Sequence, residues 1–443
     1  MRDDARPAPA RAHERQRLIQ RIARPVTPEE AIGLLRPGMR ALLPPGCAEP
    51  CTLVEEIVRQ AGRLRPLTLM GGLLLGGYPF CALEYRNTFQ WVTFHIMPAL
   101  REAAQRGQVE FIPARYFDTL WIFGPTGPWA ADAVLVQTAP PDADGRLSLG
   151  VSTSYPLPLA RSASLLIAEV NRRMPRTLGD STLRLDQVTA WVEVDRPLVA
   201  YPAPPVGDVE RRIAGHVSEL IPDGATLQVG IGAVPEAIVG VLGDRRDLGV
   251  HSLLVDAMLP LLKRGVITNA RKTRNPGRMD LGEIMGTEPL FRFVHENPLV
   301  NMEPSSLIHN PQVVARLERF VSINSAIEVD LTGQVNAESL GDRQVAGIGG
   351  QFDFVEGAYW APGGRSVIAL PSTGRGGRVS RIVVRLAAGA KVTTPRHLTD
   401  CVVTEFGRAD LRGRSVEQRA RALIALADPR FRAELEREWE AAR

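Results

Sequence analysis

The sequence predicts an α/β protein made of two similar domains. Its 443 residues exceed what one hydrophobic core usually serves. Residues 37–50 align without a gap with residues 222–235. Short apolar segments bounded by glycine or charge alternate with amphipathic ones, as expected for buried strands and surface helices. Together these observations indicate that one α/β domain has been duplicated.

The internal repeat predicts the same series of elements twice. In each copy we expect a turn, a buried strand, a Gly/Pro turn and then a helix. An amphipathic helix is expected before each copy, around residues 28–35 and 208–220. The matched positions are Pro37, Leu42, Ala48, Pro50 and Val54 in the first copy and Pro222, Leu227, Ala233, Pro235 and Val239 in the second.

A proline-rich segment predicts the boundary between the domains. Four prolines lie between residues 196 and 207, and proline is unfavourable inside helices and sheets. We therefore expect domains at residues 26–200 and 208–443, with a flexible tail over residues 1–25. In the second domain we expect buried strands at 367–370, 382–384 and 401–403, and terminal helices at 415–427 and 429–442, the latter started by Pro429.

Composition excludes several classes of protein. Hydrophobic residues make up 44% and charged residues 23%, which is typical of a globular protein, and the net charge is only +4. Because the arginines are spread along the chain, nucleic-acid binding is not expected. No segment approaches the 18 apolar residues of a membrane span, and the N-terminus is no signal peptide, so a cytoplasmic location is expected. The four cysteines are scattered and predict neither disulfides nor a metal site.

The segment from Ser322 to Phe354 is the most informative for function. Residues 322–339 alternate apolar and polar side chains like a half-buried strand, and then the chain turns. A glycine-rich loop follows at Gly347, Gly349 and Gly350, where the bare backbone can approach a ligand and direct N–H groups at it. Such donors suit a thioester carbonyl or an oxyanion. A β-hairpin with glycine turns is the alternative from spacing alone.

A second glycine segment could also direct backbone N–H groups at a ligand. Gly230, Ile231, Gly232 and Ala233 follow a predicted strand and open a predicted helix. Backbone amides at a helix N-terminus favour an anion or a carbonyl oxygen. We therefore expect the segments at 230–233 and 347–350 to face one cleft between the domains.

Several longer motifs resemble those of the acetyl-CoA hydrolase/transferase family, which includes 4-hydroxybutyrate and succinyl-CoA:acetate CoA-transferases. The resemblance spans roughly residues 30–440. Its motifs are SINSAIEVDLTGQVNAES, GIGGQFDFVEGA, and the segments 371–377, 402–413, 171–180 and 192–197.

The resemblance implies two CoA-transferase-type domains with the active site between them. It implies coenzyme A as a substrate and no separate cofactor, with a small carboxylate or another acyl acceptor as second substrate and a homodimer as the assembly. Gly350 and, as a donor to the thioester carbonyl, Asn310 are the catalytic residues that it suggests. The substrate-binding residues implied are Gly230, Ile231, Gly232, Ala233, Gly347, Gly349, Gly350, Gln351 and Arg375.

Other charged residues receive narrower predictions. The loop that carries Arg375, Arg378 and Arg381 suits the phosphates of CoA, with a solvated basic loop as the alternative. Arg176 and Asp180 are expected to tie the two domains together. We expect structural roles for three acids, Glu328, Glu338 and Asp353, the last bracing the glycine loop.

The sequence departs from the family at the nucleophile. The family uses a glutamate that attacks the acyl-CoA and carries CoA as a glutamyl thioester. Here the segment reads His251-Ser252-Leu253-Leu254, one residue short of the family pattern, with no carboxylate between Asp247 and Asp256. The glutamate is therefore interpreted as deleted between Ser252 and Leu253 or replaced by Leu253. Ser252, next to the missing glutamate, is accordingly expected at the catalytic position, and Asp256 is expected to point elsewhere. Transfer of CoA by the usual mechanism is accordingly expected to be very weak.

Two interpretations of the enzyme remain open. In the first, another carboxylate replaces the missing glutamate as the nucleophile. In the second, the thioester pocket is kept and the acyl group passes directly to an amine, an alcohol or water. A third possibility is a CoA-binding or partner subunit without catalysis. Ser252 has no motif around it, so its neighbour His251 does not indicate a catalytic pair.

Overall fold

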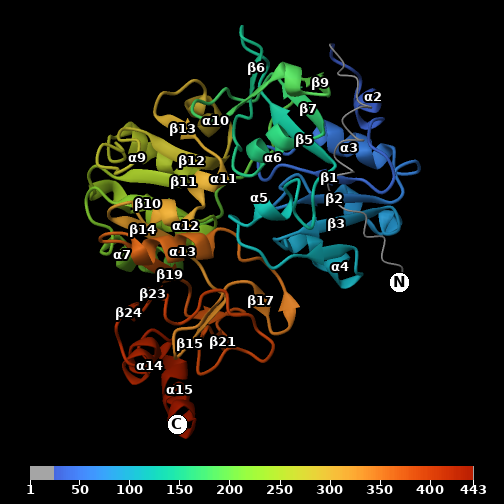
Figure 1. Cartoon of the computed structure of the whole chain (residues 1–443). Coiled ribbons are helices and arrows are strands. Elements are labelled where there is room, and N and C mark those ends of the chain that lie inside the picture. The colour runs from blue at the N-terminus through green and yellow to red at the C-terminus, as the bar shows by residue number, and fades with distance from the viewer. Residues whose placement is uncertain (1–23, 443) are drawn as a thin grey trace.

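The computed structural model describes residues 24–442, and the predicted tail over residues 1–25 lies almost entirely outside them. Two α/β halves stand side by side, and a third unit lies beneath the second half (Figure 1). The first half contains a parallel seven-stranded sheet in the order β4-β3-β2-β1-β5-β7-β9. Its strands are β4 (Val109–Phe111), β3 (Phe89–Thr93), β2 (Leu67–Gly71), β1 (Arg40–Leu42), β5 (Ala133–Thr138), β7 (Leu165–Asn171) and β9 (Ala190–Val194).

The second half repeats this topology. Its sheet has the order β13-β12-β11-β10-β14-β19-β23, which matches the first sheet strand for strand, and an antiparallel β24 (Gly407–Asp410) adds an edge. The duplication predicted from residues 37–50 and 222–235 is confirmed at this level. The other strands are β13 (Val300–Met302), β12 (Met279–Met285), β11 (Gly249–Val255), β10 (Thr226–Val229), β14 (Phe320–Asn324), β19 (Arg365–Ala369) and β23 (Cys401–Thr404).

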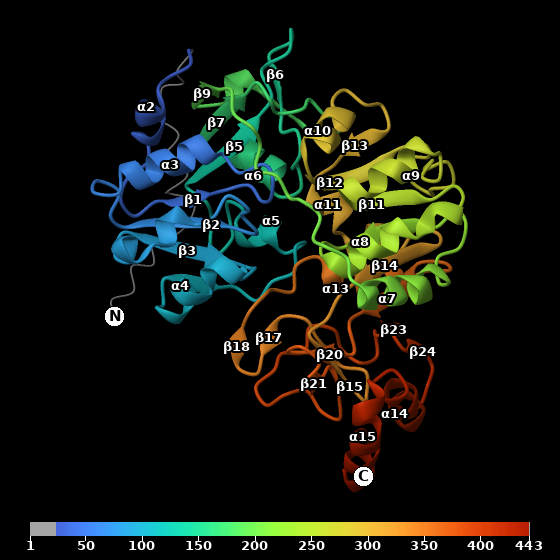
Figure 2. The same cartoon turned by 180° about the vertical axis from the view of Figure 1, so that it is seen from behind.

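Helices cover the sheets of both halves, as parallel sheets require (Figure 2). The first half has α2 (Pro28–Ile32), α3 (Cys51–Arg59), α4 (Arg101–Gln105), α5 (Thr119–Ile122) and α6 (Pro156–Ser162). The second has α7 (Asp208–Ser218), α8 (Ala233–Gly240), α9 (Leu259–Lys263), α10 (Glu288–Val294), α11 (Ser305–Ile308), α12 (Pro311–Val314) and α13 (Gln351–Trp360).

Local sequence explains where several helices begin. Thr27 accepts a hydrogen bond from the Glu30 amide and Pro28 occupies the first turn, so α2 begins with a capping box. In the two copies of the repeat, α3 follows β1 and α8 follows β10. The amphipathic helices predicted around residues 28–35 and 208–220 correspond to α2 and α7.

The predicted strand over residues 322–339 is wrong as a single element. β14 is buried along its whole length inside the large sheet, and the chain leaves this sheet at the exposed Ser325. β15 (Glu328–Asp330) belongs to a different, three-stranded sheet with β16 (Val335–Asn336) and β22 (Ile382–Val383). The polar residues Ser322 and Asn324 can be buried because they hydrogen-bond to each other and to Gln228. In the sequence, these buried polar residues give the same alternating pattern as a strand with one exposed face.

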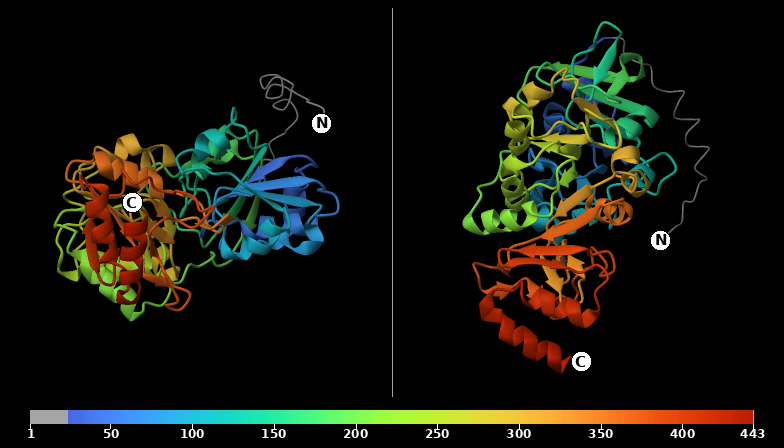
Figure 3. Two further views of the ribbon diagram at one scale, coloured as in Figure 1. Left: turned by 90° about the horizontal axis from the view of Figure 1, so that it is seen from below. Right: turned by 90° about the vertical axis from the view of Figure 1, so that its left-hand side faces the viewer.

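The third unit is formed by the C-terminal part of the chain (Figure 3). It contains the β15-β16-β22 sheet, the small pairs β17 (Ser339–Leu340) with β18 (Arg343–Gln344) and β20 (Thr373–Gly374) with β21 (Val379–Ser380), and the helices α14 (Val416–Ile424) and α15 (Pro429–Ala441). The two helices and the start of the second at Pro429 agree with the sequence prediction, with Ser415 and Asp428 as N-caps. A small ribbon, β6 (Arg146–Ser148) with β8 (Thr182–Arg184), extends from the first half.

Backbone hydrogen bonds join the two halves around β12. The amides of Thr153 and Ser154 donate to the Gly282 carbonyl, and the Ile284 amide donates to Val151. Arg176 and Asp180 also take part, as predicted, although through their backbones. The amide of Arg176 donates to Nδ1 of His295, and that of Asp180 donates to the carbonyl of Met302.

No helix within residues 24–442 has the length and apolar composition needed to cross a bilayer. In the same part of the chain, no three His, Cys, Asp or Glu side chains are grouped so that they could hold a metal ion. The four cysteines are free thiols.

Candidate functional site

A cavity of about 200 Å³ lies where the two halves meet. The second half contributes the carboxyl ends of β10 and β14, where parallel α/β sheets usually bind ligands. The first half contributes Gly46, Leu73, Phe94, His95 and Tyr116. The cavity therefore depends on the arrangement of both halves.

Both glycine segments predicted from the sequence reach this cavity. Gly230 and Ile231 line it just before α8, and Gly349, Gly350 and Gln351 line it at the start of α13. The sequence did not indicate that the second segment opens a helix. The first amides of a helix have no partner within it, so the starts of α8 and α13 bring N–H groups near the cavity, although the Gly230 amide itself donates to the Ile323 carbonyl.

The other predicted site residues lie outside the lining. Gly232 and Ala233 begin α8 one step beyond it, and Gly347 packs against the backbone of Phe94. Asn310 caps α12, where its Oδ1 accepts a hydrogen bond from the Gln312 amide. Its neighbour His309, which the sequence did not single out, lines the cavity instead.

The predicted structural acids make structural contacts. Glu338 accepts hydrogen bonds from Thr393 and Gln344, and Glu328 accepts one from Asn336. Asp256 accepts hydrogen bonds from the amide and hydroxyl of Thr287 and does not line the cavity.

Asp353 braces the contact between the halves beside the glycine loop. Its Oδ2 accepts a hydrogen bond from the Phe117 amide at 3.1 Å, and Arg115 lies 3.7 Å from its Oδ1. One residue away, the Tyr116 amide donates to the carbonyl of Gly349. The loop is thereby held against the first half, as the sequence predicted for Asp353.

The pairing of β11 with β12 shifts where the sequence predicts a missing residue. Ser252 pairs with Leu281 but Leu253 pairs with Glu283, so Gly282 has no partner on β11. Ser252 has a φ of +83°, which is unusual for a residue with a side chain. As a result, the successive residues Ser252 and Leu253 both line the cavity. Ser252 is placed in the site as expected.

Glu283 is a carboxylate of the cavity that the sequence pattern did not indicate. It is half-buried on β12, lines the cavity and pairs with Leu253 across the sheet. Oε1 accepts a hydrogen bond from the Tyr116 hydroxyl at 2.8 Å and a second from the Ser154 hydroxyl. A charged residue within the otherwise apolar segment Leu281–Met285 was the available signal, since an acid in a central strand is unusual.

The titratable groups of the cavity are strongly perturbed. Burial raises the pKa of Glu283 to about 7, although the hydrogen bond from Ser154 opposes this. Burial lowers the pKa of His309 to about 3, with a contribution from the nearby His251, and lowers that of His95 to about 4. Both histidines are therefore neutral at pH 7, and the charge in the cavity depends on Glu283.

Aromatic rings form one wall of the site. His309 stacks on Tyr116 with ring centroids 4.2 Å apart and contacts Phe354 at 4.9 Å. His251 lies behind this wall, where its Nε2 is 2.8 Å from the Ile308 carbonyl. It packs against Phe320 and Phe354 and forms no hydrogen bond with Ser252 in the described residues, so the structure provides no catalytic pair there.

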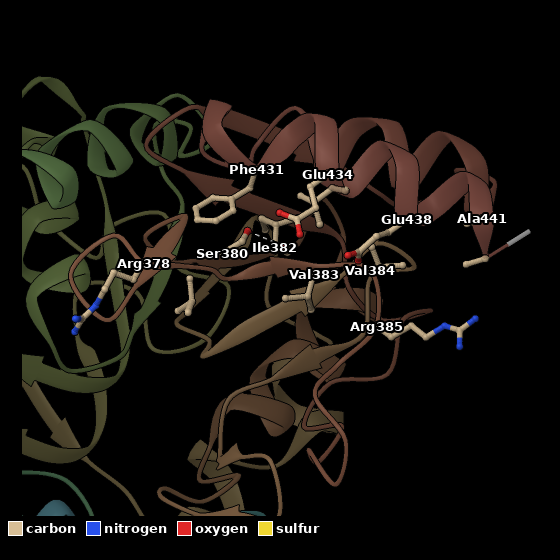
Figure 4. A pocket seen from close by; sticks show the side chains of 13 residues that line it. Arg378, Ser380, Ile382, Val383, Val384, Arg385, Phe431, Glu434, Glu438 and Ala441 are labelled. Carbon is tan, nitrogen blue, oxygen red and sulfur yellow. Dashed lines mark hydrogen bonds between the residues drawn. The ribbon is translucent and has the colours of Figure 1, made fainter.

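A larger hollow of about 720 Å³ lies in the C-terminal unit, between the β21–β22 segment and α15 (Figure 4). Phe431, Glu434 and Glu438 of α15 face it, and Arg378 lies at one end. None of the residues that line the interdomain cavity reaches it. Arg375, predicted to bind CoA phosphates, is exposed nearby with a φ of +50° and lines neither space, so that role stays a prediction.

Replacing Glu283 with glutamine should change how stability depends on pH. The folded carboxyl, with a pKa near 7 against 4.5 in the unfolded chain, holds a proton that the unfolded chain releases between these values. Its contribution to stability is complete below pH 4.5 and is lost as the pH rises through 7. The free energy of unfolding, measured in urea, should therefore rise by about 2 kcal/mol for E283Q relative to the wild type between pH 5 and pH 8. Equal pH dependence in both proteins would contradict this.

Comparison with known proteins agrees with this architecture. Residues 11–201 match the acetyl-CoA hydrolase/transferase N-terminal domain, and residues 286–439 match the C-terminal domain of the same family. The 4-hydroxybutyrate coenzyme A transferase of Clostridium kluyveri is 39% identical over 416 residues, which cover 94% of this chain and 97% of that protein.

Solved structures show the same fold over nearly the whole chain. RipA from Yersinia pestis is 34% identical with a TM-score of 0.89, covering 94% of this chain and 97% of its own. A 4-hydroxybutyrate CoA-transferase from Porphyromonas gingivalis is 33% identical with a TM-score of 0.82, covering 95% and 98%. The chain therefore belongs to the acetyl-CoA hydrolase/transferase family of enzymes.

Proposed function

We propose that this protein binds an acyl-CoA with the acyl end in the interdomain cavity and transfers CoA to a carboxylic acid. The observation that carries the proposal is the shared cavity, which is lined by both glycine segments and by one carboxylate, Glu283. The donors that we assign to the thioester carbonyl, and to the charge that develops on it, are the backbone amides of Ile231, Gly349 and Gly350, because the Gly230 amide already donates to the Ile323 carbonyl at 3.2 Å. The family membership supports the same reaction class.

The size and lining of the cavity favour a short, uncharged acyl chain. A volume of about 200 Å³ is below the roughly 300 Å³ at which sites for drug-sized ligands begin, so the acyl group fits and the nucleotide stays outside. Side chains such as Leu73, Val229, Leu253 and Met285 give it an apolar wall. No lysine or arginine lines it in the described part of the chain, and both histidines are neutral at pH 7.

A panel of acyl-CoA donors tests this proposal. Acetyl-, propionyl- and butyryl-CoA should exchange CoA with labelled acetate at least about 100-fold more efficiently than succinyl-CoA, judged by kcat/KM. The reason is that burying the second carboxylate of succinate without a cation costs several kcal/mol. Calorimetric titration with the same donors separates binding from turnover. Preferred use of succinyl-CoA would contradict the proposed substrate class, and binding of acyl-CoA without exchange would contradict the transferase activity.

Two alternatives differ in what the acyl group does after binding. Direct transfer to water or to another acceptor would consume acyl-CoA without labelled acetate being incorporated. A CoA-binding or partner subunit would bind without turnover. The presence of a carboxylate in the cavity favours CoA transfer over both. A cytoplasmic location and a homodimer remain predictions.

A further inference from the structure

Glu283 stands on the strand beside the position where the sequence lacks the family's nucleophile. Leu253 and Glu283 are in-register neighbours on parallel strands, which lie about 4.8 Å apart. Both line the cavity, whereas the next pair, Leu254 and Ile284, is buried in the core. The carboxylate therefore projects into the same space as the Leu253 side chain.

We propose that Glu283 is the catalytic nucleophile of this protein and carries CoA as a glutamyl thioester. This inference rests on the proposed transferase function. The sequence predicted very weak CoA transfer because no carboxylate lies between Asp247 and Asp256. If Glu283 is the nucleophile, that reason no longer applies. Within residues 24–442, Glu283 is the one carboxylate among the residues that line the cavity.

The surroundings of Glu283 suit a nucleophile. The hydroxyls of Tyr116 and Ser154 both bind Oε1, so neither occupies Oε2. These two hydroxyls come from the first half of the molecule, so docking of the halves fixes the orientation of the carboxylate. Burial without a cationic partner leaves the ionised group poorly solvated and hence reactive. With a pKa near 7, a substantial fraction is ionised at neutral pH.

The reaction balances without any additional reagent. An oxygen of Glu283 attacks the thioester carbonyl carbon, a C–O bond forms, the C–S bond breaks and CoA leaves as its thiolate. The thiolate then attacks the Glu283 carboxyl carbon of this mixed anhydride and releases the first carboxylic acid as its anion. The glutamyl-CoA thioester that results passes CoA to the second carboxylate by the same two steps in reverse. No net proton or electron is transferred.

An acid with a purely structural role would also be buried and hydrogen-bonded, but it would not reach the ligand. Glu169, whose hydrogen-bond donor lies within the first half, provides this comparison in the same chain. It is fully buried on β7, burial raises its pKa to about 7, and its Oε2 accepts a hydrogen bond from the Leu53 amide at the start of α3. It does not line the cavity. Glu169→Gln is therefore the matched control for Glu283→Gln.

The test is to trap the intermediate in the full-length protein. Wild type, E283Q and E169Q are incubated with acetyl-CoA, reduced with borohydride and mapped by peptide mass spectrometry. The wild type and E169Q should carry the reduced adduct on the peptide that contains Glu283. E283Q should carry none, and its exchange between acetyl-CoA and labelled acetate should fall at least about 1,000-fold, the scale on which loss of a nucleophile acts. Calorimetry should show that E283Q still binds acetyl-CoA.

Each other outcome overturns the assignment. An adduct at a different residue, or exchange by E283Q within about tenfold of the wild type, would show that Glu283 is not the nucleophile while the transferase function stands. A wild type that binds acetyl-CoA but gives neither adduct nor exchange would overturn the transferase function as well. If E283Q fails to fold, E283D serves in its place and should keep the adduct, because its carboxylate remains.

Discussion

Replacing Gly350 with valine should lower kcat/KM for acetyl-CoA by about 100-fold while the protein remains folded. A Cβ at this position would lie 2.9 Å from Cδ2 of His309 and 2.9 Å from the Phe354 ring. Both rings line the cavity, so they must move into the space that the acyl group occupies. The displaced loop would also carry the amides at the start of α13 away from the carbonyl, and loss of one oxyanion donor typically costs 10²–10³ in rate.

The effect on stability should be smaller, because the atoms that clash are in side chains. Overpacking of this kind costs about 1–3 kcal/mol. Steady-state kinetics and thermal melting on the same samples separate the two effects. Gly215→Val is the matched control, since Gly215 is exposed on α7 and a Cβ there meets nothing within 4 Å. Unchanged kcat/KM in a folded Gly350→Val protein would contradict the role assigned to this loop.

The fold was predictable where one residue pattern has one meaning. The repeat between residues 37–50 and 222–235 predicted equivalent strands and helices, and the sheets have the same strand order. The buried strands predicted at 367–370 and 401–403 correspond to β19 and β23 for the same reason: short apolar segments bounded by glycine or charge leave few alternatives.

The secondary-structure prediction failed where contacts between distant residues determine which element forms and which side chains are buried. Ser322 and Asn324 look like the exposed face of a strand, yet they are buried because Gln228 on β10 satisfies them. Residues 347–350 have little helical character, so the start of α13 at Gln351 was not visible in the glycine pattern. The small sheets of the C-terminal unit have strands of two or three residues, too short for a periodic signal.

The site was predictable in part for a related reason. Glycine-rich segments can be recognised in a sequence from their composition alone. The residues Gly230, Ile231, Gly349, Gly350 and Gln351, which belong to the two predicted segments, all line one cavity. Glu283 could not be placed there, because its position depends on which strand pairs with β11 and on the shift at Ser252. The contribution of Tyr116 and Ser154 depends on docking of the two halves, which no local pattern encodes.

Inserting a glutamate between Ser252 and Leu253 should restore CoA transfer to the E283Q variant. In the present pairing, Gly282 on β12 has no partner on β11, and the inserted residue would supply one. A Cβ at position 282 would approach Cβ of Ser154 at 3.3 Å, so a side chain inserted opposite it would face the junction of the two halves. The insertion would also remove the need for a φ of +83° at Ser252, a conformation that costs about 1–3 kcal/mol.

We expect exchange between acetyl-CoA and labelled acetate to rise at least about tenfold over E283Q alone. The exchange rate should stay below that of the wild type because the added carboxylate has no hydrogen-bond partners that fix its orientation. A small misplacement of a reacting group costs about 10²-fold in rate. Insertion of glutamine at the same point is the matched control, since it changes the strand register equally but supplies no nucleophile. Borohydride trapping should locate the adduct on the inserted residue. Equal exchange after either insertion would show that strand register, and not the carboxylate, limits the reaction. A folded glutamate insertion that binds acetyl-CoA without exchange would place the reacting carbonyl away from β11, closer to Glu283 on β12.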